Sequence, residues 1–95
     1  MKLFVSPAAN LEIREAAAWY ESQARGLSSE FLRAVAERFG QIERNPRLFA
    51  EIHAEIRRAK VRRFPYSVFY RIGETRITVE ACLHQHRDPQ DWPQH

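Results

Sequence analysis

Disulfide partners, long hydrophobic runs and metal-ligand spacings are all missing from this sequence. Its one cysteine, Cys82, excludes an intrachain disulfide, and no Cys/His spacing resembles a zinc site. The apolar run before Pro7 is too short for a signal peptide or a membrane-spanning helix. Repeats and linker-like segments are also missing. These absences predict a protein of the reducing cytoplasm that needs no metal or other cofactor and no membrane partner.

The apolar content is sufficient for a globular core. Hydrophobic residues make up 44% of the 95 residues and aromatic residues 12%, which is not the profile of a disordered chain. A chain of this length is too short for two independent cores, so we expect one domain over residues 1–95.

Positive charge is concentrated in the second half of the chain. Residues 1–55 are nearly balanced, whereas residues 56–76 carry seven Lys and Arg residues against Glu74 alone. Such a cluster attracts nucleic acid, an acidic peptide or an acidic protein face, without distinguishing among them.

Two helices are predicted in the first half. Ser6-Pro7 starts the first, because the hydroxyl can accept a free N–H and proline fits the first helical turn. Gly26 breaks the pattern, Ser28 is expected to cap the second helix, and Asn45 before proline ends it. The apolar faces at helical spacing are Ala9, Ile13, Ala16, Ala17, Tyr20 and Ala24, then Phe31, Leu32, Val35, Phe39 and Ile42.

Four strands complete the predicted fold. One short strand covers residues 2–5, and three more are expected at 56–63, 66–72 and 76–84, with residues 46–54 as a connector. The order β-α-α-β-β-β predicts an α+β fold, with a helical hairpin packed on one face of a small, mostly antiparallel sheet. The opposite face is expected to remain partly open.

The first long strand has a basic face. With a period of two, Arg58, Lys60 and Arg62 point to one side, and Ala59 and Val61 point to the other. The row of cations is either an ordinary solvated face or a surface for an anionic partner. A slip of one residue in register would reverse the assignment.

Five segments together resemble the RelE/ParE superfamily of toxins from type II toxin–antitoxin modules, which includes plasmid stabilisation proteins. The matching segments are EAAAWYE (15–21), GLSSEFL (26–32), ERNP (43–46), RRFPYSVFYRI (62–72) and LHQHRDPQDW (83–92). They cover nearly the whole chain in the family's order. The resemblance implies a small cytoplasmic toxin that a cognate antitoxin neutralises in a hetero-oligomeric complex.

The resemblance implies one of two targets. RelE-like members cut mRNA on the ribosome without a metal, and ParE-like members inhibit DNA gyrase without a nuclease site. By position, Arg58, Lys60 and Arg87 match basic residues of the nucleases. Ser67, however, stands where the nucleases carry an arginine, and Pro93 stands where they carry a late tyrosine. The ParE-like branch is therefore preferred, and the protein is more consistent with a non-enzymatic inhibitor.

The alternative is a ribosome-dependent endoribonuclease. Imidazole is the side chain that titrates near neutral pH. His84 and His86 would share one face if the last strand continued, so with Arg87 they form the candidate catalytic set. Arg58, Lys60, Arg62 and Arg63 form the candidate surface for nucleic acid or another target. A degenerate, non-toxic binding module is the third reading.

Three further residues have simpler interpretations. Glu80 is expected to form a cross-strand ion pair rather than to act as a base. Cys82 is expected to be a semi-buried thiol rather than half of a Cys–His nucleophile. Tyr66 is expected to pack in the core or sheet.

Overall fold

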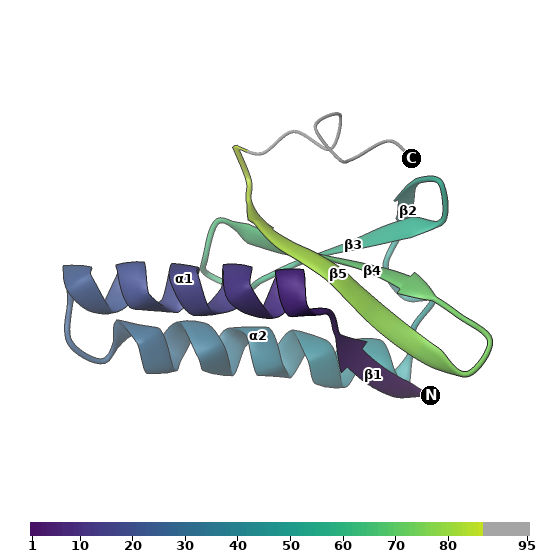
Figure 1. Ribbon diagram of the computed structural model, residues 1–95, viewed down its shortest axis with the longest axis horizontal. Coiled ribbons are helices and arrows are strands. Elements are labelled where there is room, and N and C mark those ends of the chain that lie inside the picture. Colours follow the sequence, from purple (N-terminus) through teal and green to yellow (C-terminus); the bar gives the residue numbers. More distant parts are fainter. Residues whose placement is uncertain (87–95) are drawn as a thin grey trace.

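The computed structural model describes residues 1–86, which form a helical hairpin and a five-stranded sheet (Figure 1). In chain order the elements are β1 (Lys2–Val5), α1 (Pro7–Gln23), α2 (Leu27–Arg44), β2 (Glu51–His53), β3 (Ile56–Lys60), β4 (Tyr66–Ile72) and β5 (Arg76–His84). The strand order is β1-β5-β4-β3-β2, with β1 parallel to β5 and the other pairs antiparallel. The predicted α+β fold is confirmed, with β2 as an additional strand.

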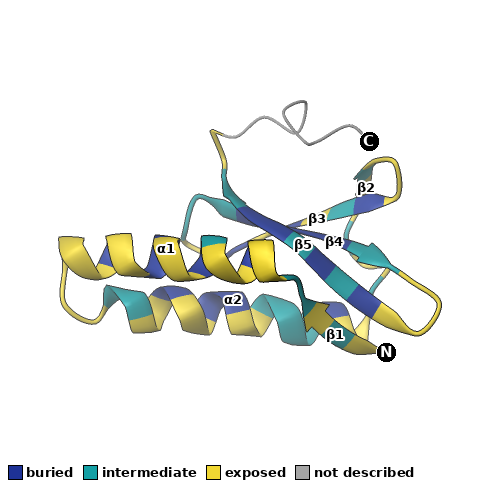
Figure 2. Ribbon diagram, in the orientation of Figure 1, coloured by how far each residue is buried: buried dark blue, intermediate teal, exposed yellow. Residues whose placement is uncertain are grey.

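The main core lies between the helical hairpin and the sheet. The buried stripes of α1 and α2 face the strands, and the outer surfaces of both helices are exposed (Figure 2). The aromatic cluster consists of Tyr20, Phe31, Phe64 and Tyr66, whose ring centroids are 5.0–6.1 Å apart. This cluster joins both helices to the β3–β4 loop and to β4. Neither helix is long and apolar enough to cross a membrane, within the part of the chain that the structure describes.

The start of α1 lies along the edge of β5 beyond the part that pairs with β1. The Ser6 hydroxyl accepts a hydrogen bond from the Ala9 amide at 3.1 Å, and Pro7 is the first helical residue, as predicted. The Ser6 amide donates to the Val79 carbonyl at 2.9 Å, where the pairing of β1 with β5 ends. One turn further, a Glu12 carboxylate oxygen accepts a hydrogen bond from the Cys82 amide at 2.9 Å. The Glu12 side chain of α1 thus covers part of the β5 edge that β1 is too short to reach.

The start of α2 differs from the prediction. The helix begins at Leu27, and Gly26 precedes it with a φ of 91°, a conformation that favours glycine. The Ser28 side chain is not the cap. Instead, the Glu21 carboxylate of α1 accepts hydrogen bonds from the amides of Gly26 at 3.1 Å and Ser28 at 3.0 Å. Leu32, predicted to lie on the apolar face, is 43% exposed.

Replacing Glu21 with glutamine should lower the melting temperature at neutral pH, because a carboxylate accepts N–H bonds more strongly than an amide oxygen. The bonds from Gly26 and then Ser28 lower the pKa of Glu21 below its usual value of 4.5. The stabilisation is therefore present above the pKa of the unfolded chain and is lost as the pH falls through the lower folded-state pKa. Thermal unfolding at decreasing acidic pH should show the melting temperatures of the wild type and Glu21→Gln becoming equal.

The matched control for this variant is Glu15→Gln. Glu15 is another exposed carboxylate of α1, and it forms no hydrogen bond or ion pair within residues 1–86. Its variant should melt like the wild type at neutral pH. Equal melting temperatures for the two variants at neutral pH would contradict the assigned role of Glu21.

The predicted connector over residues 46–54 contains β2, which pairs with β3. In this connector Phe49 packs against the main core, whereas Leu48 is 58% exposed. A three-residue strand held mainly by its neighbour leaves little local pattern for prediction.

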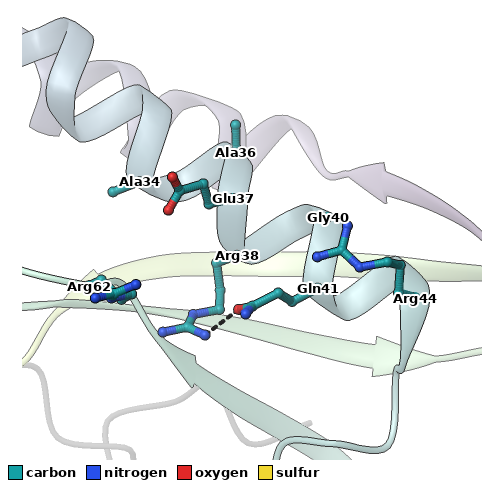
Figure 3. A pocket seen from close by; sticks show the side chains of 8 residues that line it. All are labelled: Ala34, Ala36, Glu37, Arg38, Gly40, Gln41, Arg44 and Arg62. Carbon is teal, nitrogen blue, oxygen red and sulfur yellow. Dashed lines mark hydrogen bonds between the residues drawn. The ribbon is translucent and has the colours of Figure 1, made fainter.

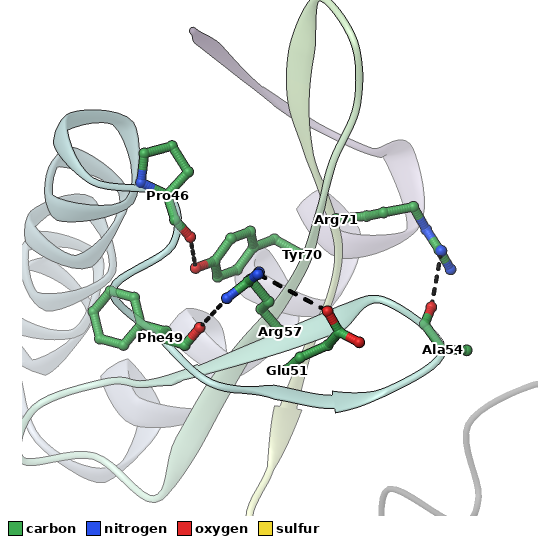
Figure 4. Close-up of polar contacts among 7 residues, drawn as sticks. All are labelled: Pro46, Phe49, Glu51, Ala54, Arg57, Tyr70 and Arg71. Carbon is green, nitrogen blue, oxygen red and sulfur yellow. Dashed lines mark hydrogen bonds and ion pairs between the residues drawn. The ribbon is translucent and has the colours of Figure 1, made fainter.

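Two side chains from the sheet hold this connector (Figure 4). The fully buried Tyr70 donates its hydroxyl hydrogen to the Pro46 carbonyl at 2.6 Å. Arg57 donates to the Phe49 carbonyl at 2.8 Å and lies 3.9 Å from a Glu51 carboxylate oxygen. The connector is therefore tied to the helix-facing side of the sheet, opposite the basic face of β3.

Candidate functional site

The face of the sheet away from the helices carries a basic site at one end. Antiparallel register places Lys60 opposite Ser67, and Ser67 opposite Leu83. In the neighbouring row, Arg58 lies opposite Phe69. The two cations on β3 thus lie beside a hydroxyl and an aromatic ring on β4, as the period of two along β3 predicts.

These side chains surround a hollow of about 180 Å³, which we call the sheet hollow. Its lining consists of Arg58, Lys60, Ser67, Phe69, Leu83, His84 and Gln85. Arg58 and Lys60 are exposed, and neither is within 4.0 Å of a carboxylate oxygen of residues 1–86. Their charges are therefore available to an anionic group from outside the described chain.

His84 and His86 meet through a turn, because the strand ends at His84 as predicted and does not continue to His86. β5 ends at His84, and the Gln85 amide donates to the Pro65 carbonyl at 2.7 Å. The His86 amide then donates to His84 Nδ1 at 3.1 Å, and the two rings stack with centroids 4.8 Å apart. Because Nδ1 accepts this bond, a neutral His84 carries its proton on Nε2.

Arg62 and Arg63 lie away from the sheet hollow, so the prediction of one continuous basic row is wrong. β3 ends at Lys60, and the Val61 amide donates to the Tyr66 carbonyl at 2.9 Å, which closes a loop. Arg63 has a φ of 69°, outside the strand region. Both arginines instead line hollows beside α2.

The last candidate, Arg87, lies outside the described residues, as does Pro93. No group of three His, Cys, Asp or Glu side chains within residues 1–86 could hold a metal ion.

Glu80 forms the predicted cross-strand ion pair, with Arg71 as its partner. Arg71 Nε lies 2.8 Å from a Glu80 carboxylate oxygen. The same guanidinium donates to the Ala54 carbonyl at 3.0 Å, as Figure 4 shows. Arg71 thereby joins β4, β5 and the β2–β3 turn. Glu80 is occupied by a structural partner and does not line the sheet hollow.

Two other candidate proton-transfer groups belong to the core. Burial and then the Glu12 charge raise the pKa of the Cys82 thiol to about 12, so it remains protonated at neutral pH. Burial also raises the pKa of Tyr66, whose ring is part of the aromatic cluster and packs against Phe31, as the sequence predicts. Neither side chain is suited to acid–base chemistry in the sheet hollow at neutral pH.

The sequence predicted the cations of the sheet hollow but not its floor. In the sequence, Ser67 is only a departure from the nuclease pattern, but in the structure it lies directly opposite Lys60. Nothing in the sequence marks Phe69 as a site residue, and only its register with Arg58 places it there. Strand pairing was the information needed to find both.

A helical hairpin over one face of a small sheet, with cations on the other face, is the architecture that the RelE/ParE resemblance implies. The family described as "ParE toxin of type II toxin-antitoxin system, parDE" matches residues 3–89, and the chain belongs to this family. A solved structure titled "Chromosomal ParDE TA system from P. aeruginosa" superposes with a TM-score of 0.67 at 16% identity. It covers 88% of this chain and 95% of the other, and at this identity the likeness shows the fold. A comparison with curated proteins gave no match.

Proposed function

We propose that this protein acts in the cytoplasm as the toxin of a type II toxin–antitoxin module, and that it inhibits DNA gyrase until a cognate antitoxin neutralises it. Membership of the ParE toxin family supports the toxin role. The observation that carries the choice of gyrase is the position of Ser67, whose hydroxyl lies opposite Lys60 in the sheet hollow.

A ribonuclease site needs a base, an acid and cations that stabilise the phosphate in the transition state. Ser67 supplies no positive charge, and a serine hydroxyl neither gains nor loses a proton readily near neutral pH. Glu80 is paired with Arg71, and Tyr66 packs in the core. Fixed cations beside an aromatic floor are better suited to binding a target than to cleaving RNA.

The second candidate is a ribosome-dependent mRNA endoribonuclease, and one observation favours it. His84 lies in the sheet hollow with Arg58 and Lys60, and His86 stacks on the His84 ring. Two imidazoles beside two cations could divide the roles of acid and base. Arg87 would supply a third cation in this alternative.

Regulated expression in bacteria tests the proposal. The wild-type protein should cause filamentation and an SOS response while protein synthesis continues, and with purified gyrase it should cause cleaved plasmid to accumulate. Arg58→Gln with Lys60→Gln should abolish both effects, because it removes the charge of the sheet hollow. Arg14→Gln with Arg25→Gln removes the same charge from exposed positions on α1 and the following loop, and should leave both effects intact.

A double variant, His84→Gln with His86→Gln, separates the two targets. Gyrase inhibition predicts that this variant remains toxic, since fixed cations are retained. Early loss of protein synthesis, with mRNA cut inside codons by the wild type but not by the variant, would establish the nuclease instead. A wild-type protein without any growth defect would contradict both and favour a non-toxic binding module. Co-expression of a short acidic product from the neighbouring reading frame should restore growth if that product is the antitoxin.

A further inference from the structure

His84 is shared by two hollows of opposite charge. It lines the sheet hollow together with Arg58 and Lys60. It also lines a hollow of about 230 Å³ whose charged residues are Glu12 and Glu15 of α1. No other titratable residue belongs to both of these linings. The charge of this one half-buried ring therefore acts on both hollows.

The turn after β5 requires a neutral His84 ring. The His86 amide donates to His84 Nδ1 at 3.1 Å, so this nitrogen cannot hold a proton while the bond exists. Imidazole gains its second proton between about pH 5 and 8. His86 is exposed, so water can accept its amide hydrogen when the bond opens. Protonation of His84 and closure of the turn thus exclude one another at a small cost.

Titratable groups surround His84 on every element packed against it. Within residues 1–86 they are Glu12, Glu15, Arg58, Lys60, Tyr66, Cys82 and His86. The two cations of β3 oppose a positive charge on His84, whereas the two carboxylates of α1 favour it. Burial raises the pKa of the phenol and of the thiol, so both are uncharged at neutral pH. A proton on the stacked ring of His86 opposes one on His84. An anion in the sheet hollow would offset the repulsion from β3 and favour the imidazolium.

The sheet hollow has the chemistry of a phosphate site. Its polar side chains are cations and uncharged hydrogen-bond donors, without a carboxylate among the described residues that line it. These donors come from three directions, namely β3, β4 and the end of β5. A phosphate has oxygens on several sides and can accept from all three, whereas a carboxylate has two oxygens in one plane. Arginine, lysine and serine are common donors to phosphate oxygens.

We propose that the sheet hollow binds a phosphate group of a nucleic acid or nucleotide, and that binding transfers a proton from the solvent to His84 and opens the His84–His86 turn. The imidazolium then supplies a third positive charge beside Arg58 and Lys60. Because binding and protonation favour one another, the affinity increases as the pH falls through the range of imidazole. This coupling rests on the sheet hollow that the proposed function uses, but it is a property of the isolated protein and needs no gyrase.

Oligothymidylate of about six nucleotides without terminal phosphates is the probe, because its phosphodiesters keep the same charge over this range. Its affinity for the full chain should be about five- to tenfold higher at about pH 6 than at about pH 8, the effect of one unit of linked proton affinity. Calorimetry in buffers of different ionisation enthalpy should show net proton uptake. Nuclear magnetic resonance should show the His84 ring titrating at a higher pH with the probe, and the His86 amide signal moving when the turn opens.

Three variants identify the group that takes up the proton. His84→Gln keeps a neutral donor but cannot titrate, so its affinity should not vary with pH. His86→Gln removes the other imidazole and keeps the backbone amide that donates to His84 Nδ1, so it should retain the pH dependence. Arg58→Gln with Lys60→Gln should lose binding at every pH.

The basic hollow beside α2 provides a matched control (Figure 3). Arg38, Arg44 and Arg62 line it together with Glu37, and no histidine is in its lining within residues 1–86. Arg44→Gln with Arg62→Gln removes two exposed cations, as the sheet-hollow variant does. It should leave the probe affinity nearly unchanged and its pH dependence intact.

A second probe, thymidine 5′-monophosphate, separates the two sources of the phosphate. Tighter binding of the oligonucleotide at one pH would assign a nucleic-acid backbone, tighter binding of the monophosphate would assign a nucleotide, and either result supports the site. A pH-independent affinity of the wild type, an unchanged pH dependence in His84→Gln, or preference for an acidic peptide would overturn the inference. Gyrase inhibition that persists without phosphate binding would overturn this inference alone and leave the proposed function standing.

Discussion

Replacing Phe31 with alanine should lower the free energy of unfolding by about 3–5 kcal/mol, because the site is fully buried and cannot collapse easily. The Phe31 ring contacts Tyr20, Phe64 and Tyr66, so its loss opens a cavity where both helices meet the sheet. A domain of this size loses about 4–8 °C of melting temperature per kcal/mol, which predicts a decrease of more than about 12 °C. Chemical denaturation and calorimetry would measure both quantities.

The neighbouring residue provides the control for this variant. Leu32 is 43% exposed, and Leu32→Ala should change stability by less than about 0.5 kcal/mol. The comparison therefore sets a core position of α2 against a surface position one residue away. A similar loss in both variants would mean that the helix face is rotated relative to the structure.

Tyr70→Phe should cost about 1–3 kcal/mol, although it removes a single oxygen atom. The hydroxyl lies in a fully buried residue and donates to the Pro46 carbonyl at 2.6 Å, and without it this carbonyl loses its partner. The connector after α2 should loosen, which would appear as faster amide exchange around β2. Urea unfolding at neutral pH measures the cost.

The pH dependence and a second tyrosine supply controls. Burial raises the pKa of Tyr70 above its usual value of 10.0, so the stabilisation by its neutral form is present below that pH and is lost as the pH rises through the folded-state pKa. The difference in free energy of unfolding between the wild type and Tyr70→Phe should therefore become smaller at alkaline pH.

Tyr66→Phe makes the same chemical change where the hydroxyl forms no hydrogen bond within residues 1–86, and its cost at neutral pH should be below about 0.5 kcal/mol. A cost as large as that of Tyr70→Phe would contradict the role of the Pro46 contact.

Elements with a strong local pattern could be predicted from the sequence. Alternation predicts the bounds of β4, 66–72, because one face of that strand packs against the helices. β5 also has the predicted bounds, 76–84, but a register shift exchanges its faces, so Val79 lies in the main core and Ala81 on the opposite face. The start of α1 follows from Ser6-Pro7, which uses only local chemistry. These features need no knowledge of distant residues.

The misplaced features depend on contacts between distant residues. Ser28 has the composition of a cap, but the Glu21 carboxylate from the other helix takes that role. Arg62 continues the period of two in the sequence, but β3 ends two residues earlier, at Lys60. There the Val61 amide donates a hydrogen bond to the Tyr66 carbonyl and the chain enters a loop. Periodicity predicts which face a residue occupies within a strand, but it does not locate the residue where the strand stops.

The candidate site shows the same division. Arg58 and Lys60 could be placed together from their spacing alone, whereas their neighbours on β4 required the register of two strands. The spacing of the arginines of α2 does not mark them as a site in the sequence. Their gathering became visible only through the loop that carries Arg62 to the same place.

The hydrogen bond from the Cys82 amide to the Glu12 carboxylate has a consequence for self-association. Within the described chain, β5 extends past the last residue paired with β1, and a bare strand flank of this kind invites a foreign strand to dock. The Glu12 carboxylate already accepts the hydrogen bond of the Cys82 amide, so this amide cannot bind an added strand. The contact thereby protects the edge of β5 against strand addition from other molecules without lengthening β1.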